Sequence, residues 1–199
     1  MKGLYNEIIQ LIAKEIKKYT PQLYYHDHTN AKNSPSPFAS SMLIKTKKKF
    51  FLVTAAHVFH KEEIKNIGIF INNYIYAIVG ELNFHEPNDE YLDPTNLDLA
   101  VYKLDYIMVD LLKKYYSFLE LKDLELNHFS SIDSRYLVFG YPAQITKPNE
   151  LKKTIEPVSM SLQTIGVAPR YYQNNIDRDK TIILLGVQNN IRPTNINSP

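Results

Sequence analysis

The chain has 199 residues, with 23 lysines and arginines against 21 aspartates and glutamates and a net charge of +2. A charge this balanced gives no support to DNA or another polyanion as the main partner, so no nucleic acid is expected. The absence of cysteine excludes disulfides, a thiol nucleophile and Cys-ligated zinc. It fits a reducing compartment, and we expect a cytoplasmic protein. No apolar run approaches the about 20 residues that cross a bilayer, so no membrane span is expected.

Residues 1–37 are expected to form an N-terminal amphipathic helix and a connector. Up to Pro21, apolar side chains recur at helical spacing with charged side chains between them. The helix either packs against the body of the domain or, because its polar face carries several lysines, meets a protein partner or a membrane surface. The charges that interrupt its apolar part, and the lack of a small-residue cleavage site, argue against a secretory signal.

From residue 38 onward the pattern favours β-strands. Lys47–Lys49 lies between two apolar runs and predicts a hairpin tip, and Asn72-Asn73 predicts another hairpin, since this pair tolerates left-handed turns. Residues 106–118 have helical spacing instead. Many short strands without intervening helices favour a barrel or sandwich. The expected strands are 38–44, 50–54, 67–71, 74–79, 98–104, 135–139, 154–165 and 181–187.

A histidine and an aspartate stand at the ends of two of these strands. His57 ends the run FFLVTAAHVF, and Asp98 begins the run DLAVYKL. Alone, His57 could be a residue at the rim of the core, but an aspartate at the start of an apolar strand would be desolvated unless something bonded to it. A carboxylate beside an imidazole accepts a hydrogen bond from Nδ1–H, fixes the tautomer and leaves Nε2 free as a base. The intervening segment is long enough for two hairpins, so one small barrel could bring the two residues together.

The two motifs together resemble the trypsin-like serine peptidases in the form common in bacteria. In that family the histidine follows a V-T-A-A-H strand end, and the aspartate begins a D-[LI]-A-[VL] strand. ASSMLI, 39–44, and YLVFGYP, 136–142, are similar to the strand ahead of the histidine and to the strand that opens the second barrel. The resemblance implies a serine endopeptidase acting on peptides or proteins, with His57 as general base and Asp98 as the residue that orients it.

The resemblance also implies a fold. It is mainly β, with two six-stranded antiparallel β-barrels of which the second is incomplete. We expect the first barrel over residues 38–105, an inter-barrel linker with a helix over 106–130, and the partial second barrel over 131–199. The chain departs from the family at Ala39 and Ser41, where a glycine is usual ahead of the histidine strand. This departure concerns the local barrel geometry more than the fold.

The serine nucleophile of the family is not recognisable. It lies in a G-x-S-G segment, whose glycines let backbone N–H groups point at the oxyanion. No serine of this chain has a glycine directly after it or two positions before it, and the last of the six glycines is Gly186. Ser40, Ser41 and the terminal Ser198 are poor substitutes, and a cluster of serines in a connector is interpreted as turn residues: Ser130, Ser131 and Ser134.

Two interpretations follow from the missing nucleophile. In one, the chain is cut off before the serine, which is expected beyond residue 199. In the other, it is a non-catalytic relative that binds peptides or a protein partner. The intact His57 and Asp98 motifs favour the first. In both, the chain as given is expected to be inactive, because losing the nucleophile costs about 10⁶ in turnover, comparable to losing the whole triad.

Other polar and aromatic clusters carry weaker signals. His26, Asp27 and His28, or His57 with His60, could suggest a metal site, but no further ligand has a recognisable spacing. We therefore expect neither a metal nor a cofactor, and the remaining histidines, His85 and His128, are interpreted as surface residues. Fifteen tyrosines include three adjacent pairs, which are expected to bury one face and keep the hydroxyl in water: Tyr24-Tyr25, Tyr115-Tyr116 and Tyr171-Tyr172.

Overall fold

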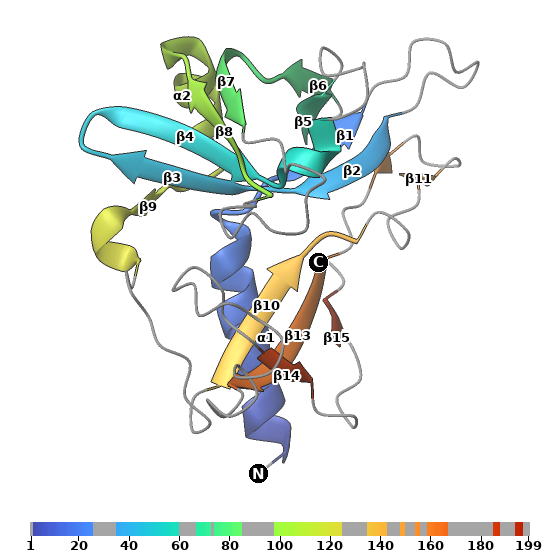
Figure 1. The fold of residues 1–199 in the computed structure, drawn as a ribbon. Coiled ribbons are helices and arrows are strands. Elements are labelled where there is room, and N and C mark those ends of the chain that lie inside the picture. The colour runs from blue at the N-terminus through green and yellow to red at the C-terminus, as the bar shows by residue number, and fades with distance from the viewer. Residues whose placement is uncertain are drawn as a thin grey trace, which may run out of the picture.

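The protein is described here from a computed structural model, which has two lobes and is mainly β (Figure 1). We call the described residues between 22 and 124 the first lobe, and residues 135–142, 159–166, 185–187 and 194–196 the second lobe. Two α-helices accompany the strands, one of them at the N-terminus. The described residues are 2–25, 35–59, 67–72, 74–84, 98–124, 135–142, 148–149, 154–155, 159–166, 185–187 and 194–196.

Helix α1 (Lys2–Lys17) confirms the expected N-terminal helix. Ala13 is buried, whereas Ile8, Leu11 and Ile12 are exposed at 45%, 67% and 45%. The apolar arc of the helix is therefore wider than the surface on which it packs. One part anchors the helix to the protein, and the other part lies in water.

One sheet of the first lobe has the strand order β2-β1-β5-β6, and each neighbouring pair is antiparallel. The hairpin between β5 and β6 turns at Asn72, whose φ of 48° is the left-handed conformation expected there; Asn73 lies outside the described residues. The strands of this sheet are β1 (Gln22–Tyr25), β2 (Ser36–Ser40), β5 (Ile67–Ile71) and β6 (Tyr74–Ala77).

The other sheet of the first lobe has the order β7-β8-β4-β3-β9. All its pairs are antiparallel except β3 with β9. The lysine turn between β3 and β4 is confirmed, with Lys47 at a φ of 53°. The strands are β3 (Met42–Thr46), β4 (Lys49–Thr54), β7 (Gly80–Phe84), β8 (Ala100–Leu104) and β9 (Leu119–Glu120).

Two continuous segments run from one sheet to the other. Only Ser41 separates β2 from β3, and only Ile78 and Val79 separate β6 from β7. At the second corner Gly80 has a φ of 155°, and a Cβ there would lie 2.3 Å from the Lys103 carbonyl oxygen. Glycine is needed at this position for both its conformation and its size. The corners turn the two sheets toward a common interior.

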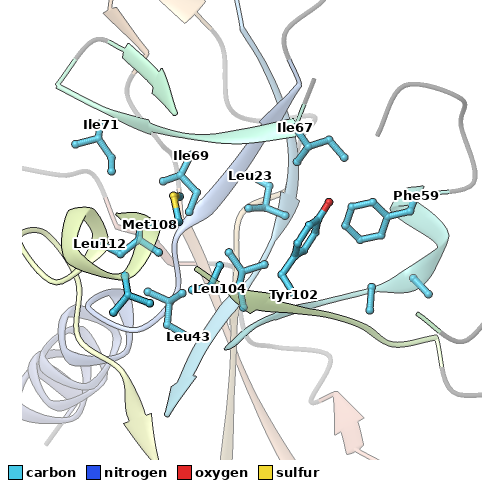
Figure 2. Packing of buried hydrophobic residues seen from close by; sticks show 14 residues of the cluster. Leu23, Leu43, Phe59, Ile67, Ile69, Ile71, Tyr102, Leu104, Met108 and Leu112 are labelled. Carbon is cyan, nitrogen blue, oxygen red and sulfur yellow. The ribbon is translucent and has the colours of Figure 1, made fainter. Parts of the chain in front are cut away.

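That interior is filled by apolar side chains from both sheets, as Figure 2 shows. Strand alternation directs one face of each strand inward, and burial of these side chains supplies the main driving force for folding. The cluster consists of Leu23, Leu43, Leu52, Ala56, Phe59, Ile67, Ile69, Ile71, Ala100, Tyr102, Leu104, Met108, Val109 and Leu112.

Helix α2 (Tyr106–Leu112) begins where the sequence predicts and ends earlier than residue 118. The Asp105 carboxylate accepts a hydrogen bond from the Met108 N–H (2.7 Å), which satisfies one of the free donors of the first turn. The segment after α2 pairs β9 with β3 and continues into the 3₁₀-helix η3 (Leu121–Asp123). Part of the expected inter-barrel linker thus belongs to the first lobe.

The second lobe is built on one antiparallel pair, β10 with β13. β14 and β15 both pair with β13, and β11 forms a separate two-stranded unit with β12. The expected strands 154–165 and 181–187 are described only in part. The strands are β10 (Arg135–Gly140), β11 (Pro148–Asn149), β12 (Thr154–Ile155), β13 (Ser159–Gly166), β14 (Leu185–Val187) and β15 (Thr194–Ile196).

The two β-barrels stay a prediction. Within the described residues the strands form open antiparallel or mixed sheets, and no closed ladder of strands is found. One sheet ends at β2 and β6, which have no second ladder partner in the described part of the chain. The other sheet has β9 at one edge, where it pairs in parallel with β3. The mainly β class with an N-terminal helix is confirmed.

Candidate functional site

The register of β4 and β8 brings two segments of the chain to the same end of one sheet. Thr54, the last residue of β4, pairs with Ala100, the first residue of β8. His57 follows Thr54 in the 3₁₀-helix η1 (Ala56–Phe59), and Asp98 precedes Ala100. Because the strands are antiparallel neighbours, positions 57 and 98 leave the sheet at a shared end. The side chain of His57 is not among those described, so its contact with Asp98 stays a prediction.

The segment that carries His57 is held by its neighbours in η1. Ala56 is fully buried, and Phe59 is 3% exposed. The Phe59 ring packs edge-on against Tyr102 of β8, with ring centroids 5.7 Å apart, and both rings are visible in Figure 2. Such an aromatic pair adds to the burial of its area. The backbone at position 57 is therefore fixed relative to β8 by an anchor on each side.

Asp98 differs from the sequence-based expectation in one respect. The residue is exposed, as is Leu99, and burial begins only at Ala100. Desolvation therefore does not force a partner on this carboxylate, and that part of the reasoning was wrong. Asp98 nevertheless takes part in a polar interaction.

The serines near the histidine segment have structural roles. The Ser41 hydroxyl is buried and donates to the Pro21 carbonyl (2.7 Å). The Ser40 hydroxyl accepts a hydrogen bond from the Tyr141 N–H (2.7 Å). Neither hydroxyl is placed as a free nucleophile. The other serines weighed from the sequence, at positions 130, 131, 134 and 198, lie outside the described residues.

Sequence reasoning passed over one buried serine in the second lobe. Ser159, at the start of β13, is fully buried, and its hydroxyl has no hydrogen-bond partner among the described residues. The same holds for the Thr164 hydroxyl farther along the strand. A hydroxyl without exposed surface cannot meet a peptide substrate, so Ser159 is not a nucleophile in this arrangement. Ser159 lies within a predicted strand, and nothing in the sequence marked it as a candidate functional residue.

The end of β10 lies against the first lobe. Tyr141 is 5% exposed, and its ring packs edge-on against Phe139, with centroids 5.5 Å apart. A Cβ at Gly140 would lie 3.0 Å from the Ser40 Oγ. The glycine of the YLVFGYP motif therefore allows a close approach of the two lobes here, rather than an unusual backbone conformation.

Three tyrosine hydroxyls gather between the lobes. Burial raises the pKa of Tyr116 to about 12. Burial first, and then the charges of Tyr116 and Tyr141, raise the pKa of Tyr24 well above its usual range. Burial followed by the charge of Tyr116 does the same to the pKa of Tyr141, and a side-chain hydrogen bond with Thr20 opposes it. All three hydroxyls stay protonated at neutral pH.

The expected packing of the tyrosine pairs is therefore wrong for Tyr24. Its hydroxyl is buried and donates to the Gln22 Oε1 (2.8 Å) rather than to water. Tyr115, which is 46% exposed, follows the expectation and accepts a hydrogen bond from the Asn72 side chain. The pair at 171–172 lies outside the described residues.

The described part of the chain holds no group of three or more metal-ligating side chains. The clusters at 26–28 and at His60, and the histidines at 85 and 128, lie outside it. Over the same residues no helix has the length and apolar character needed to cross a membrane. Comparisons with protein families, with curated proteins and with solved structures find no match to this chain.

Proposed function

We propose that this chain is a domain of a trypsin-like serine endopeptidase, in which His57 is the general base and Asp98 orients it. The observation that carries the proposal is the pairing of Thr54 with Ala100, which supports a meeting of the two residues at one sheet end. The Asp98 carboxylate would accept a hydrogen bond from the imidazole Nδ1–H and stay ionised. The Nε2 atom would then take the proton of a serine hydroxyl as that oxygen attacks the peptide carbonyl.

The proposal also includes the arrangement of the strands in β-barrels. We infer that the two sheets of the first lobe are the two sides of one β-barrel and that the second lobe is part of another. The two segments that continue from sheet to sheet, through Ser41 and through Ile78–Val79, support this arrangement. The nucleophile would come from a G-x-S-G segment encoded after residue 199. The absence of cysteine supports a reducing, cytoplasmic location, which cell fractionation would test.

A titration of this chain tests the proposed pair without any activity. A carboxylate within reach of an imidazole favours the charged ring and raises its pKa. In Asp98→Asn, we expect the His57 pKa, followed by NMR, to fall, because the ring loses its negative neighbour. Asp110→Asn, which removes another exposed aspartate of the first lobe, is the matched control and should leave the His57 pKa unchanged. Equal titrations in wild type and Asp98→Asn would remove the orienting role.

Activity is tested on a chain extended to include the downstream serine. An active-site serine probe such as a fluorophosphonate should label the extended wild type and leave His57→Ala unlabelled. Asp98→Asn should slow peptide hydrolysis about 10⁴-fold, as the wrong imidazole tautomer does in Ser-His-Asp peptidases. Equal labelling of wild type and His57→Ala would refute the general base.

A second candidate is a non-catalytic, protease-like module that binds a protein partner through α1. The exposed Ile8, Leu11 and Ile12 favour it, because they give the helix an apolar stripe that the rest of the protein leaves in water. A partner that co-purifies with wild type should be lost in Leu11→Ser and kept in Gln10→Ser, which changes an exposed polar position of the same helix. Retention of the partner in Leu11→Ser would reject this surface.

A further inference from the structure

Ser40 makes hydrogen bonds to both lobes. Its carbonyl oxygen accepts from the Thr54 Oγ1 (2.7 Å), at the end of β4 from which the His57 segment continues. Its hydroxyl oxygen accepts from the Tyr141 N–H (2.7 Å), at the end of β10. One residue thus contacts the segment that leads to the histidine and the segment that opens the second lobe.

The fit around the Ser40 hydroxyl is close. A methyl group at Gly140 would meet the Oγ at 3.0 Å, and among the described residues its next neighbour is the Ser40 Cβ at 3.8 Å. A methyl group at position 140 would therefore press on this hydroxyl. Thr54 is itself buried, so its hydroxyl has little access to water as an alternative partner.

We propose that Ser40 is a positioning residue that holds the His57 end of β4 at a fixed distance from the second lobe. This inference rests on the proposed function, because the distance matters only if the base on the first lobe must meet a nucleophile and substrate held by the second. A displacement of about 1 Å between reacting groups can cost about 100-fold in rate. A single serine that bonds to both strand ends restricts such displacement.

The contact itself is tested by hydrogen exchange. Ser40→Ala removes the acceptor of the Tyr141 N–H, and exchange of this amide should become about tenfold faster. Ser40→Thr keeps a hydroxyl and should restore the slow exchange. Ser36→Ala changes an exposed serine on the same strand and is the matched control. Unchanged exchange at Tyr141 in Ser40→Ala would overturn the contact.

A double-mutant cycle with Gly140 tests whether the two lobes meet at this hydroxyl. Gly140→Ala should be destabilising in the wild-type background, because its methyl group presses on the Ser40 Oγ. In the Ser40→Ala background the same change should cost clearly less, because the oxygen is gone. Additive effects would mean that the two residues do not touch.

The positioning role is tested on the extended, active chain. Ser40→Ala should lower kcat for a peptide about tenfold or more with KM little changed, and Ser40→Thr should recover most of the rate. Faster exchange at Tyr141 with an unchanged kcat would overturn positioning and leave the peptidase intact. If the extended wild type shows no activity and no labelling, the proposed function is overturned, and the positioning role with it. The hydrogen-exchange data would still report the contact between the lobes.

Discussion

The two lobes differ in the buried residues that the structure describes. In the described residues, the hydrophobic cluster takes all its members from the segment between Leu23 and Leu112, in the first lobe. The buried residues described in the second lobe are Tyr141, Ser159 and Thr164, and the hydroxyls of the last two have no partner. The first lobe therefore carries the apolar core on which the candidate site is built. The described contact of the second lobe with the first runs through Ser40, Gly140 and Tyr141.

The largest expected effect tests the apolar core of the first lobe. Leu52→Ala, at a fully buried position of β4, should destabilise the protein by about 2–5 kcal/mol, because it removes apolar contacts and leaves a cavity. Val138→Ala in β10, where the side chain is 45% exposed, should cost less than about 1 kcal/mol. Urea unfolding followed by circular dichroism measures both. Equal losses would contradict the contribution of the buried Leu52 side chain to the apolar core.

The tyrosines between the lobes give a pH dependence. Burial raises the folded pKa of Tyr116 to about 12, so its contribution to stability is complete below the unfolded pKa near 10 and is lost as pH rises toward 12. The loss is on the order of 2 kcal/mol across that window. Urea midpoints between pH 8 and pH 11 should fall, and less so in Tyr116→Phe. A variant that falls as steeply as wild type would contradict this assignment.

The start of α2 gives a smaller effect within the first lobe. Asp105→Ala removes the carboxylate that accepts from the Met108 N–H, and the free energy of unfolding should fall by about 1 kcal/mol. Asp105→Asn keeps an acceptor oxygen and should lose only part of this. If Asp105→Asn and Asp105→Ala lose equally, the cap is not the cause.

The smallest expected effect concerns a buried hydroxyl of the second lobe. Thr164→Val replaces a buried hydroxyl that lacks a partner with a methyl group of similar size. Unfolding should become more costly by up to about 1 kcal/mol, since no desolvated hydroxyl remains. Thr54→Val, which removes a bonded hydroxyl in the first lobe, should have the opposite sign. A loss of stability in Thr164→Val would mean that the hydroxyl has a partner.

The elements that the sequence predicted best have strong local patterns. Lys49–Thr54, Ile67–Ile71 and the core of 98–104 are strands because apolar, β-branched and aromatic residues dominate them. The two hairpin turns were predictable from residues that tolerate left-handed backbone. The amphipathic helix before Pro21 was predictable from its spacing.

The elements that the sequence did not predict form by pairing with strands far away in the chain. Gln22–Tyr25 is only four residues long and becomes β1 because β2 and β5 bond to it on both sides. β9 has two residues and exists through its parallel pairing with β3. Helix α2 ends early because the chain must turn toward that pairing. No local pattern encodes these partners.

The two residues of the candidate site were predictable from the sequence. Their exposure and the segments that surround them were not. The motifs indicated residues 57 and 98, and the sheet register is consistent with their meeting. The exposure of Asp98 was not predictable, because it depends on which segments cover the end of the sheet. The role of Ser40 required knowledge of the Tyr141 backbone, which is far away in the chain.

The most direct measurement is the distance between the His57 Nδ1 and the nearer Asp98 carboxylate oxygen in a crystal structure of the chain. The account predicts a hydrogen bond of ~2.6–3.2 Å at the shared end of β4 and β8. Side chains farther apart than ~6 Å, with the imidazole bonded to another group, would contradict it.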